Sequence, residues 1–341
     1  MERSLPQGDV RVARTSYGAA LAGLDRAATD AGWRLFDRIA TRNWLLEWRL
    51  PRWLGESLDL GAEAAEALAL ANVFGLAYVR LRDDLADGET ESADWAQTLA
   101  ATLHDRWVAV YIQLFDGQRA FWRCFQQYMI EWRQSDESPT RPFEAYTTDD
   151  FLRLAHRGAP LKIGCAAAYL LAHRPGIMPA LTKTIDCLLV AAVLLDHVKD
   201  WRDDLAAGRY NAFVSYVSAL AQTPENRVAN RRAVWQELAA GDVGRPYFHT
   251  IRNWLRLAAA EAQPIGCSGL SRYLAWLEAE AVGFGERLAT AADAGLRAAT
   301  ERLWAASTAP GGRADHSWQE GYSNGNFGPD GSPGGAGDVR R

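Results

Sequence analysis

The chain has 341 residues, of which 48% are hydrophobic, and a formal net charge of −5. A chain of this length can bury a sizeable core, and its acidic balance, with no segment dominated by Lys and Arg, argues against a nucleic-acid-binding protein. The longest apolar run, residues 187–195, is shorter than the roughly 20 residues that a membrane span requires, so we expect no membrane-spanning helix.

The N-terminal residues 1–16 are polar without a clear period, and we expect them to form an arm. From Tyr17 onward apolar residues recur with a helical period, and the alternating patterns of strands are missing. Gly and Pro residues separate the predicted helices. These helices are expected at 17–40, 60–87, 93–115, 118–134, 148–173, 179–207, 225–240, 247–262 and 269–306.

The C-terminal residues 308–341 are rich in Gly and poor in aliphatic side chains, so we expect a disordered tail. The chain is therefore predicted to be all-α, with one helical domain at 17–307. Its four cysteines lack the spacing of a metal or redox motif, and no secretory signal opens the chain. These features predict free thiols and a cytoplasmic protein.

Four aspartates follow the apolar run within one predicted helix. At 100° per residue, Asp196, Asp200, Asp203 and Asp204 fall within an arc of about 100° on one face. A solvated face is the simplest interpretation. However, two pairs in this run are four residues apart, and like charges at that spacing repel by roughly 0.2–0.5 kcal/mol per pair. A bound cation would remove this repulsion.

A second acidic cluster, formed by Asp83, Asp84 and Asp87, shares one face of the helix predicted at 60–87. Arg80 could pair with Asp84 in a surface ion pair, or could hold that carboxylate in place for a ligand. A site made of carboxylates without His or Cys suits a hard ion such as Mg²⁺, which often binds through one or two carboxylates and substrate phosphates. Two such clusters facing each other could hold a metal-bound diphosphate.

The two clusters resemble the metal motifs of class I isoprenoid synthases. Asp83-Asp84-Leu85-Ala86-Asp87 is a DDxxD pattern, and Asp196, Asp200 and Asp204 are similar to the second motif of terpene cyclases, with Asp where Asn and Ser or Thr are usual. The run from Lys199 to Arg209 is also similar to the second motif of squalene and phytoene synthases. The resemblance implies a single-domain helical bundle of the class I isoprenoid synthase type, with a central active-site cavity.

The resemblance further implies a class I terpene synthase. In such an enzyme the aspartates hold a cluster of three Mg²⁺ ions, basic side chains help to draw diphosphate off a linear prenyl chain, here C15 or C20, and the carbocation cyclises. Gly158 and Pro160 interrupt a predicted helix, as in the related cyclases, where an Arg beside such a break senses the diphosphate. The basic and polar residues expected to bind diphosphate are Arg153, Arg157, Lys162, Arg209, Arg272 and Tyr273, of which Arg157, Lys162 and Arg209 are expected to assist ionisation.

Aromatic side chains could line the expected cavity, because their faces attract cations and offer no lone pair that would trap a carbocation. The candidates are Phe74, Tyr78, Trp107 and Tyr111, although aromatic residues at helical spacing are more often part of a core.

Two alternatives remain open from the sequence. One is a prenyltransferase, including the head-to-head type of squalene and phytoene synthases. The other is a non-catalytic helical protein whose acidic faces are solvated or bind a basic partner. The expected partner is a small prenyl diphosphate, with a homodimer possible.

Overall fold

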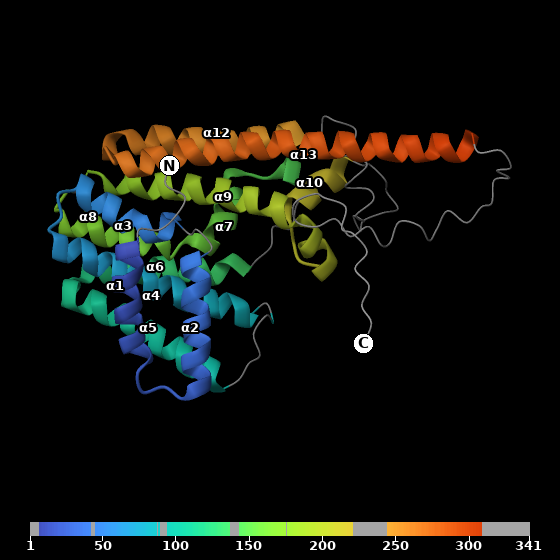
Figure 1. Ribbon diagram of the computed structural model, residues 1–341. Coiled ribbons are helices and arrows are strands. Elements are labelled where there is room, and N and C mark those ends of the chain that lie inside the picture. The colour runs from blue at the N-terminus through green and yellow to red at the C-terminus, as the bar shows by residue number, and fades with distance from the viewer. Residues whose placement is uncertain are drawn as a thin grey trace.

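The computed structural model describes residues 7–41, 45–86, 88, 94–136, 143–174, 176–220 and 244–308. All regular elements in these residues are helices, which confirms the predicted all-α class for the described part of the chain (Figure 1). The helices are α1 (Gln7–Leu21), α2 (Arg26–Thr41), α3 (Leu45–Ser57), α4 (Ala62–Ala86), α5 (Asp94–Phe115), α6 (Arg119–Arg133), α7 (Thr148–Ala155), α8 (Leu161–Leu171), α9 (Met178–Ala207), α10 (Ala212–Leu220), α12 (Gly244–Ala262) and α13 (Ser268–Thr308), with short 3₁₀ turns η1 (Gln134–Asp136), η2 (Phe143–Ala145), η3 (His156–Gly158) and η4 (Gln263–Ile265).

Two long helices, α4 and α9, organise the bundle. Helix α4 packs against α3, α5 and α8, while α9 packs against α7, α8, α10 and α12. By length and composition both could cross a membrane, but 56% of the apolar window of each is buried inside the bundle, as in the core helix of a soluble protein. Helix α8 packs against both α4 and α9 and therefore links the two helices that carry the acidic clusters.

The N-terminal segment differs from its prediction. Helix α1 begins at Gln7, inside the segment expected to be an arm, and the helix predicted at 17–40 is two helices joined by a turn at Gly23, where φ is +101°. Tyr17 is fully buried and its ring lies against Phe36 and Phe74. Packing of α1 against the bundle therefore orders residues that look polar when read alone.

Helix α3 was not predicted, because Pro51 was taken as a breaker. Proline inside a helix removes a hydrogen bond and costs about 3 kcal/mol. Here the cost is offset by burial, because most apolar side chains of this short helix lie in the core. The buried side chains are those of Leu46, Trp48, Leu50, Trp53 and Leu54.

The predicted interruption near Gly158 is present. Helix α7 ends at Ala155, η3 follows, and α8 begins at Leu161. A Cβ atom added at Gly158 would lie 2.4 Å from the Leu189 side chain, so glycine lets the break approach α9 closely. The helix predicted at 225–240 and the tail from residue 309 lie outside the described residues, and α10 was not predicted.

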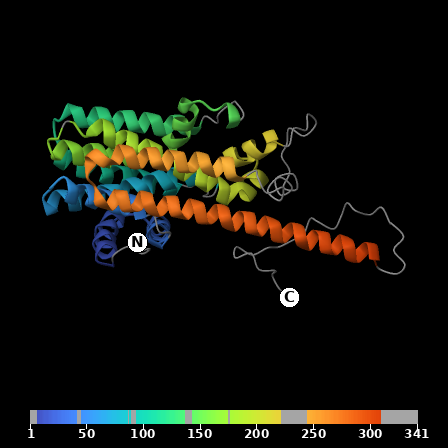
Figure 2. The same ribbon diagram turned by 90° about the horizontal axis from the view of Figure 1, so that it is seen from above.

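Helices α12 and α13 run antiparallel along one side of the bundle. The N-terminal part of α13 packs against α12 and α3, and its C-terminal part extends past the other helices in both views (Figures 1 and 2). The extension is on the side where α4 and α9 end.

Candidate metal and diphosphate site

The end of α4 places the two described aspartates of the first cluster in different surroundings. Asp84 forms an ion pair with Arg38 of α2, and its side chain is 12% exposed. Asp83 is 25% exposed and lies 3.9 Å from Arg80, so Arg80 pairs with Asp83 and not with Asp84 as the sequence had suggested. Asp87 lies outside the described residues. Asp84 is thus committed to a contact within the protein.

Three aspartates near the end of α9 face solvent. Asp196, Asp200 and Asp203 are exposed, and within the described part of the chain none of them forms a hydrogen bond or an ion pair. Partial desolvation, followed by the charges of Asp196 and Asp204, raises the pKa of Asp200 to about 6. The nearby Lys199 opposes this rise without cancelling it. The carboxylates therefore repel each other, as expected from their spacing.

Asp204 is held by the segment that follows the helix. Its Oδ1 atom accepts a hydrogen bond from Arg209 Nε at 3.1 Å, and its Oδ2 atom accepts one from Asn211 Nδ2 at 2.8 Å. Gly208 ends α9 in the left-handed region, with φ of 68°, and thereby turns the chain back on the helix. Arg209, which was predicted to bind diphosphate, consequently contacts Asp204, which was predicted to bind a metal ion.

The same turn buries His197. Asn211 Nδ2 donates to the His197 carbonyl at 2.9 Å, and the backbone N–H of Ala212 donates to His197 Nδ1 at 3.1 Å. Burial lowers the pKa of His197 to about 4, while Asp204 acts to raise it and Arg157 to lower it. Neither His197 nor Asn211 was among the predicted site residues, and the role of Asn211 depends on the turn after Gly208.

Arg157 is a further predicted donor that the fold brings near the acidic part of α9. It belongs to η3, is exposed, and acts electrostatically on His197 at the acidic part of α9. Arg153, one turn earlier, is half-buried in α7, which packs against α9, and acts on His156. The interruption of the α7–α8 segment therefore places cationic side chains beside α9.

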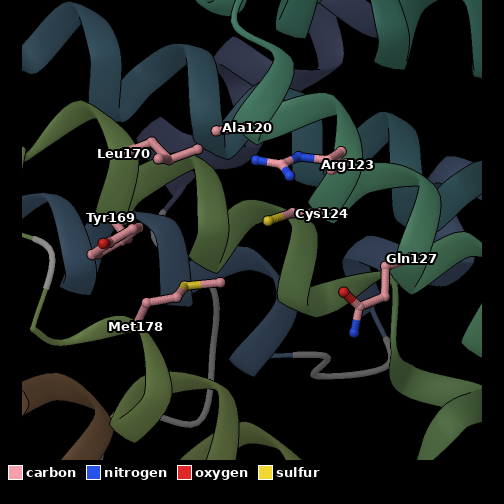
Figure 3. A pocket seen from close by; sticks show the side chains of 7 residues that line it. All are labelled: Ala120, Arg123, Cys124, Gln127, Tyr169, Leu170 and Met178. Carbon is pink, nitrogen blue, oxygen red and sulfur yellow. The ribbon is translucent and has the colours of Figure 1, made fainter.

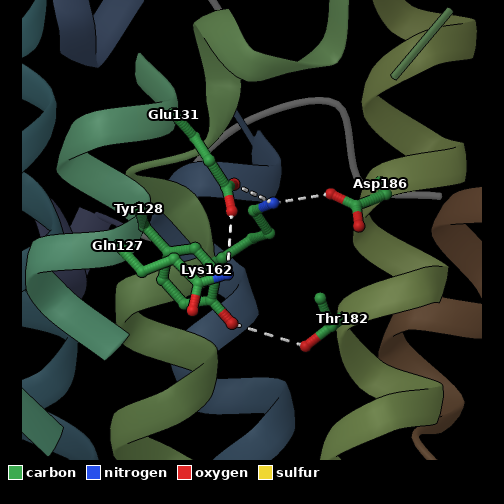
Figure 4. Close-up of polar contacts among 6 residues, drawn as sticks. All are labelled: Gln127, Tyr128, Glu131, Lys162, Thr182 and Asp186. Atoms are coloured by element: carbon green, nitrogen blue, oxygen red, sulfur yellow. Dashed lines mark hydrogen bonds and ion pairs between the residues drawn. The ribbon is translucent and has the colours of Figure 1, made fainter. Parts of the chain in front are cut away.

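Lys162 has a different environment from the one predicted (Figure 4). Its Nζ atom lies 2.5 Å from Glu131 and 2.7 Å from Asp186, and the side chain is only 4% exposed. The ammonium group also lies 4.8 Å from the centre of the Tyr128 ring. The Lys162 ammonium is thus paired with two carboxylates, one from α6 and one from α9, and it is not among the diphosphate donors of the proposed site.

Arg272 and Tyr273 are not brought to the acidic clusters. They lie in the N-terminal part of α13, where the Tyr273 ring is 6.0 Å from that of Trp53 in α3. This part of α13 lies at the opposite end of the bundle from the ends of α4 and α9 (Figure 1). The late Arg-Tyr pair is therefore not part of the site that we propose.

The predicted cavity aromatics belong to the core. Phe74, Trp107 and Tyr111 are at most 3% exposed. The Trp107 ring packs against Phe125, and the half-buried Tyr78 lies beside Trp107. These contacts join α4, α5 and α6, which is the structural role that the sequence left open.

The two acidic segments lie at the same end of the bundle, because α4 and α9 both end towards the right of Figure 1. In the described residues, no three His, Cys, Asp or Glu side chains are grouped closely enough to hold a metal ion by themselves. The open carboxylates of Asp196 and Asp200 and the less exposed Asp83 can each supply hard oxygen ligands. Such a set suits ions that keep most of their water or are completed by a phosphate ligand.

No protein-family model matches the chain, and no curated protein matches it.

Proposed function

We propose that the protein is a class I terpene synthase that ionises a linear prenyl diphosphate with Mg²⁺ and cyclises the resulting carbocation. Support comes from the DDxxD pattern at the end of α4, the aspartates of α9 at the same end of the bundle, and Arg157 beside them. The all-helical architecture is compatible with this chemistry.

One observation carries the proposal. Asp196 and Asp200 are exposed and are paired with no described cation, and partial desolvation together with the charges of Asp196 and Asp204 raises the pKa of Asp200. A divalent cation would turn this repulsion into attraction, and the oxygen donors fit Mg²⁺. Bound Mg²⁺ would supply positive charge to stabilise the departing diphosphate.

The residues of this chain would have separate roles. Asp83, Asp196 and Asp200 would bind the ions, with Asp87 a further candidate from the sequence. Arg157 would donate hydrogen bonds to the diphosphate and neutralise the charge that develops on it. Arg209 is 40% exposed and its ion pair with Asp204 is therefore weak, so Arg209 can exchange Asp204 for a diphosphate oxygen. Asp204 would then join the metal ligands.

The decisive experiment is incubation of the purified chain with C10, C15, C20 and C25 prenyl diphosphates and Mg²⁺, followed by hydrocarbon analysis. We expect a cyclic product from one chain length, C15 or C20, and no product when Mg²⁺ is removed. Asp196→Asn and Asp200→Asn should each abolish product formation. Asp105→Asn is the matched control, because Asp105 is 82% exposed on α5 and should be dispensable.

The other outcomes identify the alternatives. A condensed product from two prenyl chains would establish a prenyltransferase. A thermal shift with Mg²⁺ and inorganic diphosphate is expected of either enzyme, because a ligand that binds only the folded state stabilises it. If neither a product nor such a thermal shift is observed, the proposal is contradicted and a non-catalytic protein is favoured.

A further inference from the structure

The outward face of α6 is unusual for a protein with a net charge of −5. At 100° per residue, three arginines, a tryptophan, an isoleucine and a glutamine fall within an arc of about 100°. All of these side chains except the half-buried tryptophan are exposed. These residues, which we call the α6 basic face, are Arg119, Trp122, Arg123, Gln126, Ile130 and Arg133.

Positive charge on this face is not neutralised by the part of the protein that the structure describes. Arg119, Arg123 and Arg133 form no ion pair with any described residue. The one acidic residue of α6, Glu131, is outside the arc and is engaged with Lys162. The face thus carries three cations and no carboxylate of its own helix.

Apolar side chains accompany these cations. Ile130 is 52% exposed, the highest value among the exposed large apolar side chains of the described residues. Trp122 rests on Phe125 and donates a hydrogen bond from Nε1 to the Phe115 carbonyl, so its indole is held in place at the edge of the face. Arginine with exposed aliphatic and aromatic groups is the composition of helices that lie in a membrane interface.

Two adjoining hollows sit beside the face and share Arg123. One, of about 660 Å³, is formed by α6 and the preceding turn, and includes Arg119, Trp122 and Gln126. The other, of about 410 Å³, lies between α6, α8 and the start of α9 (Figure 3). Arg123 extends towards Leu170 in this view, while Cys124 and Met178 add apolar lining.

We infer that the α6 basic face docks the protein on an anionic phospholipid membrane, with lipid phosphates at Arg119 and Arg123 and part of an acyl chain against Leu170 and Met178. Charge complementarity favours this occupant, because anionic lipid attracts clustered arginines. The exposed Ile130 and the apolar lining by Leu170 and Met178 favour lipid as the occupant, because acyl chains bury apolar surface. This inference does not depend on the proposed enzymatic activity.

The test is co-sedimentation of the full chain with vesicles of phosphatidylcholine alone or mixed with phosphatidylserine. We expect binding only to the mixed vesicles, and weaker binding as salt increases. The variant Arg119→Gln/Arg123→Gln/Arg133→Gln should bind roughly 100-fold more weakly, since each arginine contributes about fivefold near an anionic surface. Arg11→Gln/Arg26→Gln/Arg34→Gln is the control, with the same change in charge at exposed positions of α1 and α2.

A second variant, Ile130→Ser, separates membrane insertion from simple charge attraction. It leaves the charge unchanged and should weaken vesicle binding several-fold without altering the circular dichroism spectrum. The inference would be overturned if both triple variants lost vesicle binding equally. It would also be overturned if the unmodified chain did not bind the mixed vesicles, or if it bound heparin but not vesicles.

Discussion

Arg38 on α2 and Asp84 on α4 form an ion pair across 46 positions of sequence. The contact links the N-terminal helices to the end of α4. It also separates two adjacent aspartates of one motif, because Asp83 is more exposed and lies beside Arg80. The DDxxD pattern thus contains one carboxylate held by another helix and one that is more accessible to a ligand.

This difference predicts that one conservative substitution mainly affects stability and the other mainly affects activity. Asp84→Asn should lower the free energy of unfolding by about 1–2 kcal/mol, because the partly buried Arg38 guanidinium loses its charged acceptor. Asp83→Asn should lower the free energy of unfolding by less than Asp84→Asn does, and should abolish Mg²⁺-dependent product formation. Urea denaturation and product analysis of both variants check this. Equal loss of stability in the two variants would contradict the assignment.

The aspartates of α9 predict a pH-dependent cost in stability. The pKa of Asp200 is about 6 in the folded protein, against an ordinary value of 3.8, so the folded state holds this proton more tightly. Stability should therefore fall as the pH rises from about 4 to about 6. Because the residue is exposed and screened by salt, the cost should be below about 1 kcal/mol.

Asp200→Asn removes this cost. In metal-free buffer at pH 7 the variant should melt at a higher temperature than the unmodified chain, and the difference should vanish near pH 4. Addition of Mg²⁺ with inorganic diphosphate should reverse the order, since only the chain with Asp200 gains from the ions. Thermal melts over this pH range make the comparison, and a variant that is less stable at every pH would disprove the repulsion.

The ion pairs of the buried Lys162 predict that the stability lost by replacing this lysine is regained when its two carboxylate partners are also neutralised. Lys162→Met leaves Glu131 and Asp186 facing each other without a cation and should cost about 3 kcal/mol. Adding Glu131→Gln and Asp186→Asn to Lys162→Met should restore most of this stability, because no unpaired charge remains. Chemical denaturation measures the recovery.

The same set of variants tests the original expectation that Lys162 assists catalysis. If the ion pairs serve the fold alone, the neutral triple variant should keep activity. A stable but inactive triple variant would return Lys162 to the diphosphate site.

Gly269 predicts a steric effect at the contact of α13 with α3. A Cβ atom at this position would lie 2.3 Å from the indole of Trp53, a rigid and buried side chain. Gly269→Ala should therefore destabilise the protein by about 1–3 kcal/mol, although alanine favours the helix. Trp53→Leu should reduce the additional cost of Gly269→Ala in a double-mutant cycle. Additive effects would show that the contact is not formed.

Local patterns in the sequence were enough to predict most of the helices and the acidic faces. The helices predicted at 60–87 and 179–207 are observed as α4 and α9, and the interruption at Gly158 is where it was expected. Periodicity, glycine and proline act over a few residues, so these features can be read without knowledge of the packing.

Only the tertiary structure decided which charges remain open. Lys162 finds its partners 31 and 24 positions away, Asp84 is held by a helix far earlier in the chain, and α3 forms around Pro51 because its apolar side chains are buried. The sequence by itself determined that carboxylates line one face of α4 and of α9, because side-chain direction repeats every 3.6 residues of a helix. Whether each carboxylate meets a cation or water depends on which helices pack together, and that is decided by the burial of apolar surface across the whole bundle.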